Sequence, residues 1–292
     1  MVNRYSPLIF FYPRFVKSKL KKYIYCYCLI KNVKIYLNKV HYKAKNMEDN
    51  MERILIEGYE FIKINFPGAS AVFSTAKNNL NFNKLEDMGR KNINNLKGWF
   101  NLKNIGYLNQ VHGCDSIIYK GNLEDADGII TNVPYEAVGV FNADCAPVLL
   151  YDRKEKVIAA VHSGWRGTLS CIVLKTIEKL QKDFKSNPFN ISACIGPHIC
   201  SSCYEVGEEV INEFKNSTFY KDKYIFEGRN LSLKECILYQ LKDSGVRDEN
   251  INSLDICTSC NTEYDLYSYR KNKYQGRLFS FIYLNSPVNC ES

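Results

Sequence analysis

The chain has 292 residues, 46% of them hydrophobic, and a formal net charge of +8. This length is enough to bury the core of one large domain or two small ones. The charge is uneven: residues 1–46 hold eleven Lys or Arg and no Asp or Glu, so the remaining 28 basic and 31 acidic residues give −3. The body therefore lacks the basic patch that is typical of nucleic-acid-binding proteins.

The cysteines and the apolar runs argue against a disulfide-stabilised scaffold and against a membrane-spanning protein. Twelve cysteines at uneven spacing do not indicate a disulfide scaffold in a chain of this length. The apolar runs Leu8–Tyr12 and Tyr23–Ile30 are shorter than the ~20 residues that span a bilayer, and no secretory signal stands out. We therefore expect a cytoplasmic, monomeric protein with mostly free thiols that binds neither membranes nor nucleic acid.

Residues 1–46 are basic and rich in tyrosine, unlike the rest of the chain. Three interpretations stay open: an extension upstream of a true start at Met47 or Met51, a mobile basic arm, or a membrane-surface anchor. We expect a disordered or non-native extension without an assigned function. The single catalytic domain is then expected over residues 47–292.

The strands and helices expected in the body alternate irregularly. Short apolar or alternating runs predict strands at residues 61–66, 71–75, 117–119, 129–131, 137–141, 148–151, 157–161, 191–195, 251–257 and 278–284. Amphipathic spacing predicts helices at 83–104, 168–184, 208–214 and 232–242. Several strands are hairpin neighbours, and no Gly-rich nucleotide motif follows a strand. The pattern therefore favours an α+β fold with mixed sheets and flanking helices.

Two of these helices carry more detailed predictions. In the first, the inward positions are expected to be Leu85, Met88, Ile93, Leu96 and Phe100. In the second, Thr168 is the expected N-cap.

A candidate metal site comes from three residues at points where predicted strands break. His112 lies in N-Q-V-H-G, Cys145 in F-N-A-D-C-A-P and His162 in A-A-V-H-S-G-W-R-G. A thiolate and two neutral imidazoles suit zinc or copper, and three protein ligands leave a fourth position for water or substrate. The alternative is two hydrogen-bonded core histidines and a buried thiol, because separations of 33 and 17 residues match no local metal motif.

Further motifs make a resemblance specific. They are I-G-P-H-I-C-S-S-C-Y-E-V-G at 195–207, C-T-S-C at 257–260, Y-S-Y-R at 267–270 and Q-G-R at 275–277. With the three above, they resemble the laccase-domain family over roughly residues 61–284. The resemblance implies a zinc-dependent purine nucleoside phosphorylase in which His112, Cys145 and His162 bind the metal at the catalytic centre. It also implies phosphorolysis of adenosine, inosine, guanosine or methylthioadenosine, with adenosine deamination as a second activity.

Substrate and phosphate candidates lie around these ligands. Arg166 follows His162 at an expected helix start, where an anion is favoured; the alternative is a solvated arginine. The family shows F-S-T-R near its start, whereas this chain has Lys77 after F-S-T-A. Lys77 and Asn81 are therefore substrate- or phosphate-binding candidates. Arg270 and Arg277 are further cationic candidates.

Two carboxylates and two C-x-x-C pairs remain, and structural roles are open for all of them. Asp144 adjoins Cys145 and is placed to orient a ligand histidine, although turn capping is an equal alternative for it and for Asp127. The C-x-x-C pairs at 200–203 and 257–260 are about 53 residues apart, far beyond zinc-ribbon spacing. A zinc ribbon of Cys200, Cys203, Cys257 and Cys260 is one alternative, but this spacing favours packed thiols for Cys203 and Cys257.

Two rival functions stay open. The first is a copper-dependent polyphenol oxidase, although the chain's four histidines are too few for the mononuclear and trinuclear copper centres of a full laccase. The second is a metal- or redox-sensing binding protein without turnover.

Overall fold

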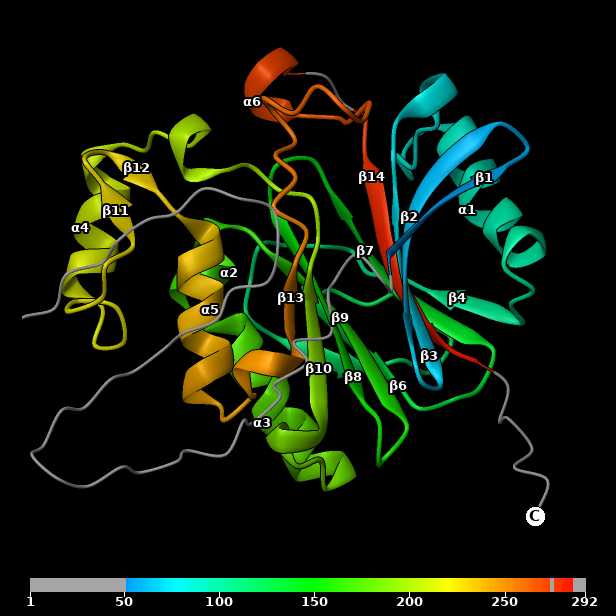
Figure 1. Ribbon diagram of the computed structural model, residues 1–292, viewed down its shortest axis with the longest axis horizontal. Helices are drawn as coiled ribbons and strands as arrows, with labels where there is room; N and C mark the ends of the chain where they lie inside the picture. The colour runs from blue at the N-terminus through cyan, green and yellow to red at the C-terminus, as the bar shows by residue number, and fades with distance from the viewer. Residues whose placement is uncertain (1–50, 274–275, 286–292) are drawn as a thin grey trace, which may run out of the picture. The chain divides into compact units, whose positions relative to one another are not determined.

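The computed structural model describes residues 51–273 and 276–285, so the predictions for residues 1–46 lie outside the described part. Two six-stranded sheets and flanking helices make up this part (Figure 1). The strand order is β1-β2-β3-β14-β7-β4 in the first sheet and β13-β10-β8-β9-β6-β5 in the second. Both sheets contain parallel and antiparallel pairs, which confirms the predicted α+β class with mixed sheets.

The bounds of the elements are as follows. The first sheet has β1 (Met51–Ile56), β2 (Tyr59–Phe66), β3 (Ala69–Ser74), β4 (Asn104–Gly106), β7 (Glu136–Asn142) and β14 (Leu278–Leu284). The second has β5 (Ser116–Ile118), β6 (Gly128–Thr131), β8 (Ala146–Asp152), β9 (Val157–Ser163), β10 (Ile191–Ile195) and β13 (Ile251–Ser253). A small ribbon pairs β11 (Phe226–Glu227) with β12 (Asn230–Leu231). The helices are α1 (Asp87–Trp99), α2 (Trp165–Leu169), α3 (Ile172–Phe184), α4 (Glu208–Asn216), α5 (Leu233–Asp243) and α6 (Tyr269–Asn272).

The two sheets pack face to face, and helices cover their outer faces. One apolar cluster joins the inner faces, with Ile62 and Val138 from the first sheet against Leu149 and Ile158 from the second. α3 and α5 pack on the outer face of the second sheet, and α1 packs on the outer face of the first. Because β8 and β9 are covered on both sides, every residue in them is buried, which explains their nearly continuous apolar sequence.

The first predicted helix is shorter than expected. It runs from Asp87 to Trp99, so Leu85 precedes it and is 79% exposed. Met88 in the first turn is 56% exposed, whereas Ile93 and Leu96 are buried as predicted. The inward assignment of Leu85 and Met88 was wrong because the helical period was counted from too early a start.

The second predicted helix is broken. The chain forms α2, passes through Cys171 with a left-handed φ of 59°, and then forms α3. Thr168 is not the N-cap: it lies inside α2, where its hydroxyl is 2.7 Å from that of Ser163. The break lets α2 begin immediately after Gly164, closer to His162 than the sequence predicted.

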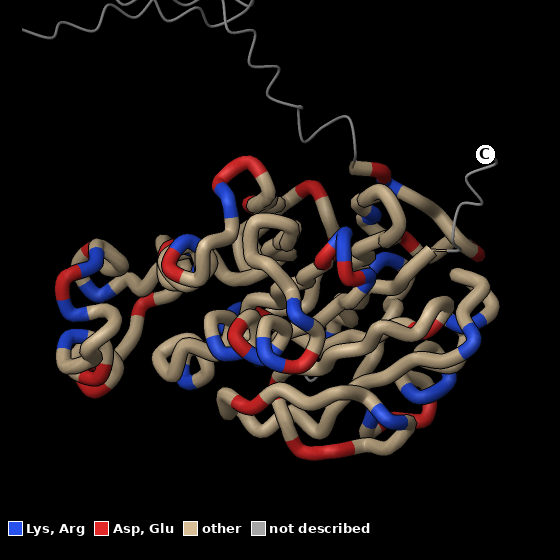
Figure 2. Tube along the Cα trace, turned by 90° about the horizontal axis from the view of Figure 1, so that it is seen from below, with Lys and Arg blue, Asp and Glu red and all other residues tan. Residues whose placement is uncertain are grey.

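Charges of both signs are interspersed over the described chain (Figure 2). Among the described residues, no helix has both the length and the apolar character needed to cross a bilayer.

Candidate metal centre

The three predicted ligands meet where the chain passes between the two sheets. The connection from β4 to β5 carries His112, and the turn from β7 to β8 carries Cys145. His162 is the penultimate residue of β9, which pairs antiparallel with β8. Cys145, which precedes β8, therefore lies beside Gly164, which follows β9. Motifs that are far apart in sequence converge at this end of the two strands.

The geometry of this group suits a metal ion. The ligand atoms of His112, Cys145 and His162 all lie within 4.8 Å of one another. The two imidazole rings are 4.9 Å apart and nearly perpendicular, at 85°. A Cβ on Gly164 would lie 2.9 Å from Cys145 Sγ and 3.3 Å from His112 Cδ2. Only glycine leaves this space open, so a side chain at this position would crowd the site.

Asp127 organises two of the three ligands. Its fully buried carboxylate accepts a 2.8 Å hydrogen bond from His162 Nδ1, which leaves Nε2 as the nitrogen available to a metal. It also accepts from the backbone N–H groups of Val111, His112 and Gly113, at 3.2, 3.1 and 2.6 Å. These bonds hold His112 in its left-handed conformation, with φ 59°.

The carboxylate of Asp144 binds Thr258 and the backbone of Arg270. Its Oδ1 accepts from Thr258 Oγ1 at 2.6 Å, and its Oδ2 accepts from the backbone N–H of Arg270 at 2.7 Å. Its carbonyl accepts from the N–H of Ile199 at 3.0 Å. Asp144 therefore ties two other segments to the turn that holds Cys145. Of the two alternatives left open for Asp144, orienting a ligand histidine was wrong, since Asp127 makes the contact with His162.

Gln110 is a positioning residue that the sequence reasoning missed. Its amide nitrogen donates to Phe141 O at 2.8 Å, and its amide oxygen accepts from Phe141 N at 2.7 Å. This pair of bonds fastens the loop of His112 to the end of β7, just before the turn of Cys145. The signal in the sequence was a glutamine two residues before His112.

The electrostatics favour a thiolate beside a protonated imidazole in the metal-free site. Burial alone would raise the pKa of the Cys145 thiol, but the charge of His162 and hydrogen bonds with both histidines lower it to about 6. Burial alone would lower the pKa of His162, but the Cys145 thiolate and the hydrogen bond to Asp127 raise it to about 9. Burial opposes the ionisation of Asp127, yet its bonds with His162 lower its pKa.

Two arginines, Arg166 and Arg270, act on Tyr204 near this group. Arg166 is exposed in α2 and stacks on its neighbour Trp165, with 4.3 Å from the guanidinium carbon to the ring centroid. Arg270 stacks on Tyr204 at 5.3 Å and donates to Glu205 O at 2.9 Å. Burial raises the pKa of the Tyr204 phenol, and the charge of Cys145 acts in the same direction, whereas both arginines oppose it. Tyr204 thus lies in the electrostatic field of the cluster and of Arg166.

Lys77 and Asn81 have structural partners. Lys77 Nζ lies 3.6 Å from the carboxylate of buried Glu60. The Asn81 side chain accepts from the N–H groups of Asn83 and Arg277, both at 2.9 Å, and donates to Glu86 at 3.1 Å. Their assignment to substrate or phosphate stays a prediction.

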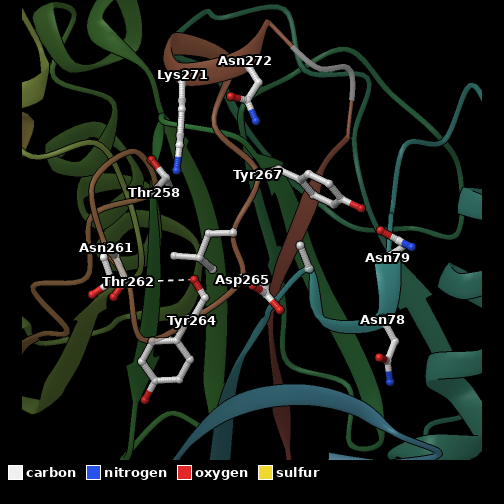
Figure 3. Close-up of a pocket in the computed structure, with 12 residues that line it drawn as sticks. Asn78, Asn79, Thr258, Asn261, Thr262, Tyr264, Asp265, Tyr267, Lys271 and Asn272 are labelled. Atoms are coloured by element: carbon white, nitrogen blue, oxygen red, sulfur yellow. Dashed lines mark hydrogen bonds between the residues drawn. The ribbon is translucent and has the colours of Figure 1, made fainter.

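A cavity of about 690 Å³ lies beside the site, within the range of small-molecule pockets. Thr258, whose hydroxyl binds Asp144, lines it together with residues around α6 and the 3-10 turn Lys77–Asn79. In Figure 3, Lys271 extends from α6 toward Thr258, and the ring of Tyr267 lies on the side of Asn79. None of the three predicted metal ligands lines this cavity. Thr258 connects the cavity to the His-Cys-His group through its bond to Asp144.

Comparison with known proteins shows the family of this chain. A family model described as multi-copper polyphenol oxidoreductase laccase matches residues 68–285. The chain belongs to this family. It is 46% identical over 230 residues to a purine nucleoside phosphorylase of Clostridium acetobutylicum, which covers 78% of this chain and 97% of that protein. The predicted resemblance is therefore confirmed.

Two further matches widen the comparison. Adenosine deaminase RL5, from an unknown prokaryotic organism, is 30% identical over 166 residues, covering 55% of this chain and 63% of that protein. The crystal structure of a Bacillus licheniformis hypothetical protein, YfiH, superimposes with a TM-score of 0.72 at 24% identity, covering 80% of this chain and 99% of that one. The latter shows a shared fold.

Proposed function

We propose that this protein is a purine nucleoside phosphorylase with a zinc centre at His112, Cys145 and His162. It cleaves the N-glycosidic bond of adenosine, inosine, guanosine or methylthioadenosine with phosphate, and deaminates adenosine as a second activity. The observation that carries the proposal is the convergence of three zinc-type ligand atoms within 4.8 Å, in a chain 46% identical to a protein named purine nucleoside phosphorylase. We place the enzyme in the cytoplasm as a monomer.

The donor set supports zinc as the metal. One thiolate and two imidazoles are typical of zinc sites with three protein ligands, and the glycine at position 164 leaves space above the sulfur. When bound, zinc supplies a Lewis acid or an activated water. The chain's own contribution is positional: Asp127 fixes the ring of His162 with Nε2 toward the cluster, and Gln110 holds the loop of His112 in place.

Phosphate is placed beside Arg166. Its side chain is exposed, its guanidinium carbon lies 4.3 Å from the ring centroid of Trp165, and it offers paired donors that match phosphate oxygens. Arg270 adds positive charge on the side of Tyr204. We assign Lys77 and Asn81 a weaker part, because Glu60, Asn83, Glu86 and Arg277 already engage them. The nucleoside would reach the metal from the cavity beside Thr258.

The test is an assay of the full-length protein with inosine and with adenosine, each in the presence and absence of phosphate. Free base should appear only with phosphate, and inosine should form from adenosine in either case. In Cys145→Ala, both activities and about one equivalent of zinc should be lost. Cys114→Ser is the matched control, since Cys114 is a free, half-buried cysteine outside the three ligands.

Two outcomes would contradict the proposal. Zinc bound by wild type and lost in Cys145→Ala, without release of base, would leave a metal site with another function, such as metal or redox sensing. Stoichiometric copper with consumption of oxygen would favour the polyphenol oxidase that the family description names.

A further inference from the structure

Four cysteines outside the His-Cys-His group form a second cluster. The sulfur atoms of Cys200, Cys203, Cys257 and Cys260 all lie within 4.8 Å of one another. Cys200 Sγ and Cys260 Sγ are 3.8 Å apart. We name this group the four-cysteine cluster.

Strand pairing in the second sheet creates this cluster. β10 and β13 run parallel, with Ile195 opposite Ser253. Beyond the strands, His198 bridges to Cys257 in the same parallel sense: its N–H donates to Ile256 O at 3.1 Å, and its carbonyl accepts from Thr258 N at 3.0 Å. The two C-x-x-C turns therefore leave the sheet side by side. The long separation of the two pairs along the chain does not keep them apart, because it does not limit partners in a parallel pair.

We propose that these four cysteines bind a second zinc ion as a closed, tetrahedral tetrathiolate site. A Zn–S bond of about 2.3 Å places the sulfurs of a tetrahedron about 3.8 Å apart, which is the separation of Cys200 and Cys260. Two residues separate the cysteines within each pair, as in structural zinc sites. Four protein ligands leave no open position, so the role of this ion is structural.

The backbone around Cys257 is arranged for a thiolate. Its sulfur accepts from the N–H groups of Cys200 and Ser259 at 3.3 Å, and from that of Cys260 at 3.4 Å. Three donors aimed at one sulfur stabilise negative charge there. A C-x-x-C turn that points its amides at the first sulfur is therefore suited to hold a cation between the thiolates.

Packed thiols, the expectation from sequence, fit the surroundings less well. Buried cysteines that behave as small apolar residues lie inside the core, as Cys194 and Cys236 do, both 0% exposed. In the four-cysteine cluster, Cys260 is exposed, and Cys200 and Cys203 are half-buried. The structure also has all four as free thiols, not as disulfides, whose sulfurs would lie about 2.05 Å apart. Three of the four side chains reach solvent and none of the sulfurs is covalently bonded to another, which is typical of metal ligands.

The cluster also borders the first metal centre. Thr258, next to Cys257, donates to Asp144, the neighbour of Cys145. Tyr204, next to Cys203, lies in the field of Cys145. A zinc ion here would lock both segments against the turn of Cys145, although it takes no part in the reaction.

The experiment measures the zinc content of the full-length protein and the absorption of its cobalt form. Wild type should hold about two equivalents of zinc, and Cys203→Ser/Cys260→Ser about one. The control Cys114→Ser/Cys171→Ser changes two free, half-buried cysteines outside both clusters and should keep the wild-type content. Cys145→Ala should also keep about one equivalent, and its cobalt form should show the intense thiolate-to-metal absorption of a four-sulfur site.

Cys145→Ala keeps the proposal falsifiable even if the double variant does not fold, because all four cysteines of the cluster remain intact in it. Unchanged zinc content in Cys203→Ser/Cys260→Ser, no cobalt absorption in Cys145→Ala, or iron in place of zinc would each overturn the proposal. An absence of base release would not, so this test is independent of the proposed enzyme activity.

Discussion

The His-Cys-His centre and the four-cysteine cluster differ in the way that catalytic and structural metal sites differ. The former has three ligands, of which His112 is exposed and His162 is 3% exposed, and Gly164 keeps the space above the sulfur open. The latter has four ligands of one kind and no open position. This difference fits the roles that we propose, a substrate site for the first and a link between two segments for the second.

The two groups also differ in what fixes them. A buried carboxylate, Asp127, positions two ligands of the first by four hydrogen bonds. The second is positioned by backbone N–H groups on Cys257 and by the bridge between His198 and Cys257. Substitution of one positioning side chain should therefore weaken metal binding at the first centre more than at the second. The following variants test this contrast, from the largest expected effect to the smallest.

Cys145→Ala should have the largest effect. Loss of the only sulfur ligand should lower phosphorolysis by at least about a thousandfold, which corresponds to about 4 kcal/mol of transition-state stabilisation. The four-cysteine cluster should keep its metal. Activity assays and zinc analysis of the same preparation check this, and retained activity in the variant would exclude Cys145 from the centre.

Asp127→Asn should weaken zinc binding at the first centre by about 10–100-fold, because the orienting acceptor of His162 is altered. Removing one partner of a buried ion pair should also cost about 3 kcal/mol of unfolding free energy. The pKa of Asp127 is lowered by folding, so its stabilisation is present above an unfolded pKa of about 3.9 and is lost as pH falls through the folded value.

Competition with a chelator and urea denaturation measure the two effects of Asp127→Asn. Asp115→Asn, an exposed carboxylate on the loop that carries His112, is the control and should change neither quantity. Equal effects in both variants would show that the contact between Asp127 and His162 contributes neither to zinc affinity nor to stability.

The pH dependence of Cys145 should be distinctive in the metal-free protein. With its pKa lowered to about 6, the thiolate persists at neutral pH and is lost only as pH falls below that value. At pH 7 its thiolate fraction should exceed that of a thiol of pKa 8.5 by about thirtyfold. Iodoacetamide labelling read by peptide mass spectrometry checks this, and a half-maximal rate near pH 8.5 would contradict it.

Gly164→Ala should reduce zinc affinity about tenfold, because the new Cβ would lie 2.9 Å from Cys145 Sγ and overpacking costs about 1–3 kcal/mol. Gly98→Ala is the matched control, since a Cβ there meets nothing within 4 Å. In a helix, that change should stabilise the protein by about 0.5–1 kcal/mol. Isothermal titration with zinc compares the two, and equal affinities would show that Gly164 does not border the metal.

Thr258→Val should have the smallest effect, a few-fold loss of activity with about 1–2 kcal/mol of destabilisation. It removes the hydroxyl that donates to Asp144 while both sets of metal ligands stay intact. Thr218→Val, at an exposed position that does not line the cavity, controls for the substitution. No difference between them would mean that the four-cysteine cluster and the first centre are not linked through Asp144.

Much of the first centre could be predicted from the sequence because its residues lie in motifs at strand ends. His112, Cys145 and His162 each interrupt an apolar run, and most strands were found by alternation or apolar character. Local patterns could not reveal which carboxylate reaches His162. Asp127 does so through the pairing of β6 with β9, whereas Asp144, closer in sequence to a ligand, points to Thr258.

The four-cysteine cluster was the less favoured alternative from the sequence for a related reason. Its two halves follow β10 and β13, and their parallel pairing is a tertiary fact that spacing along the chain does not encode. The break at Cys171 was hidden in the same way, because its left-handed φ of 59° interrupts a sequence with an unbroken helical period. Contacts between distant segments overrode the local signals in both cases.

The most direct measurement is anomalous X-ray scattering at the zinc edge from crystals of the full-length protein. We predict two peaks, one bound by the imidazoles of His112 and His162 and by Cys145 Sγ, the other at the centre of the four cysteine sulfurs. The first should disappear in Cys145→Ala and the second should remain. No anomalous density between His112, Cys145 and His162 in zinc-replete wild-type crystals would contradict the metal centre on which the proposed function depends.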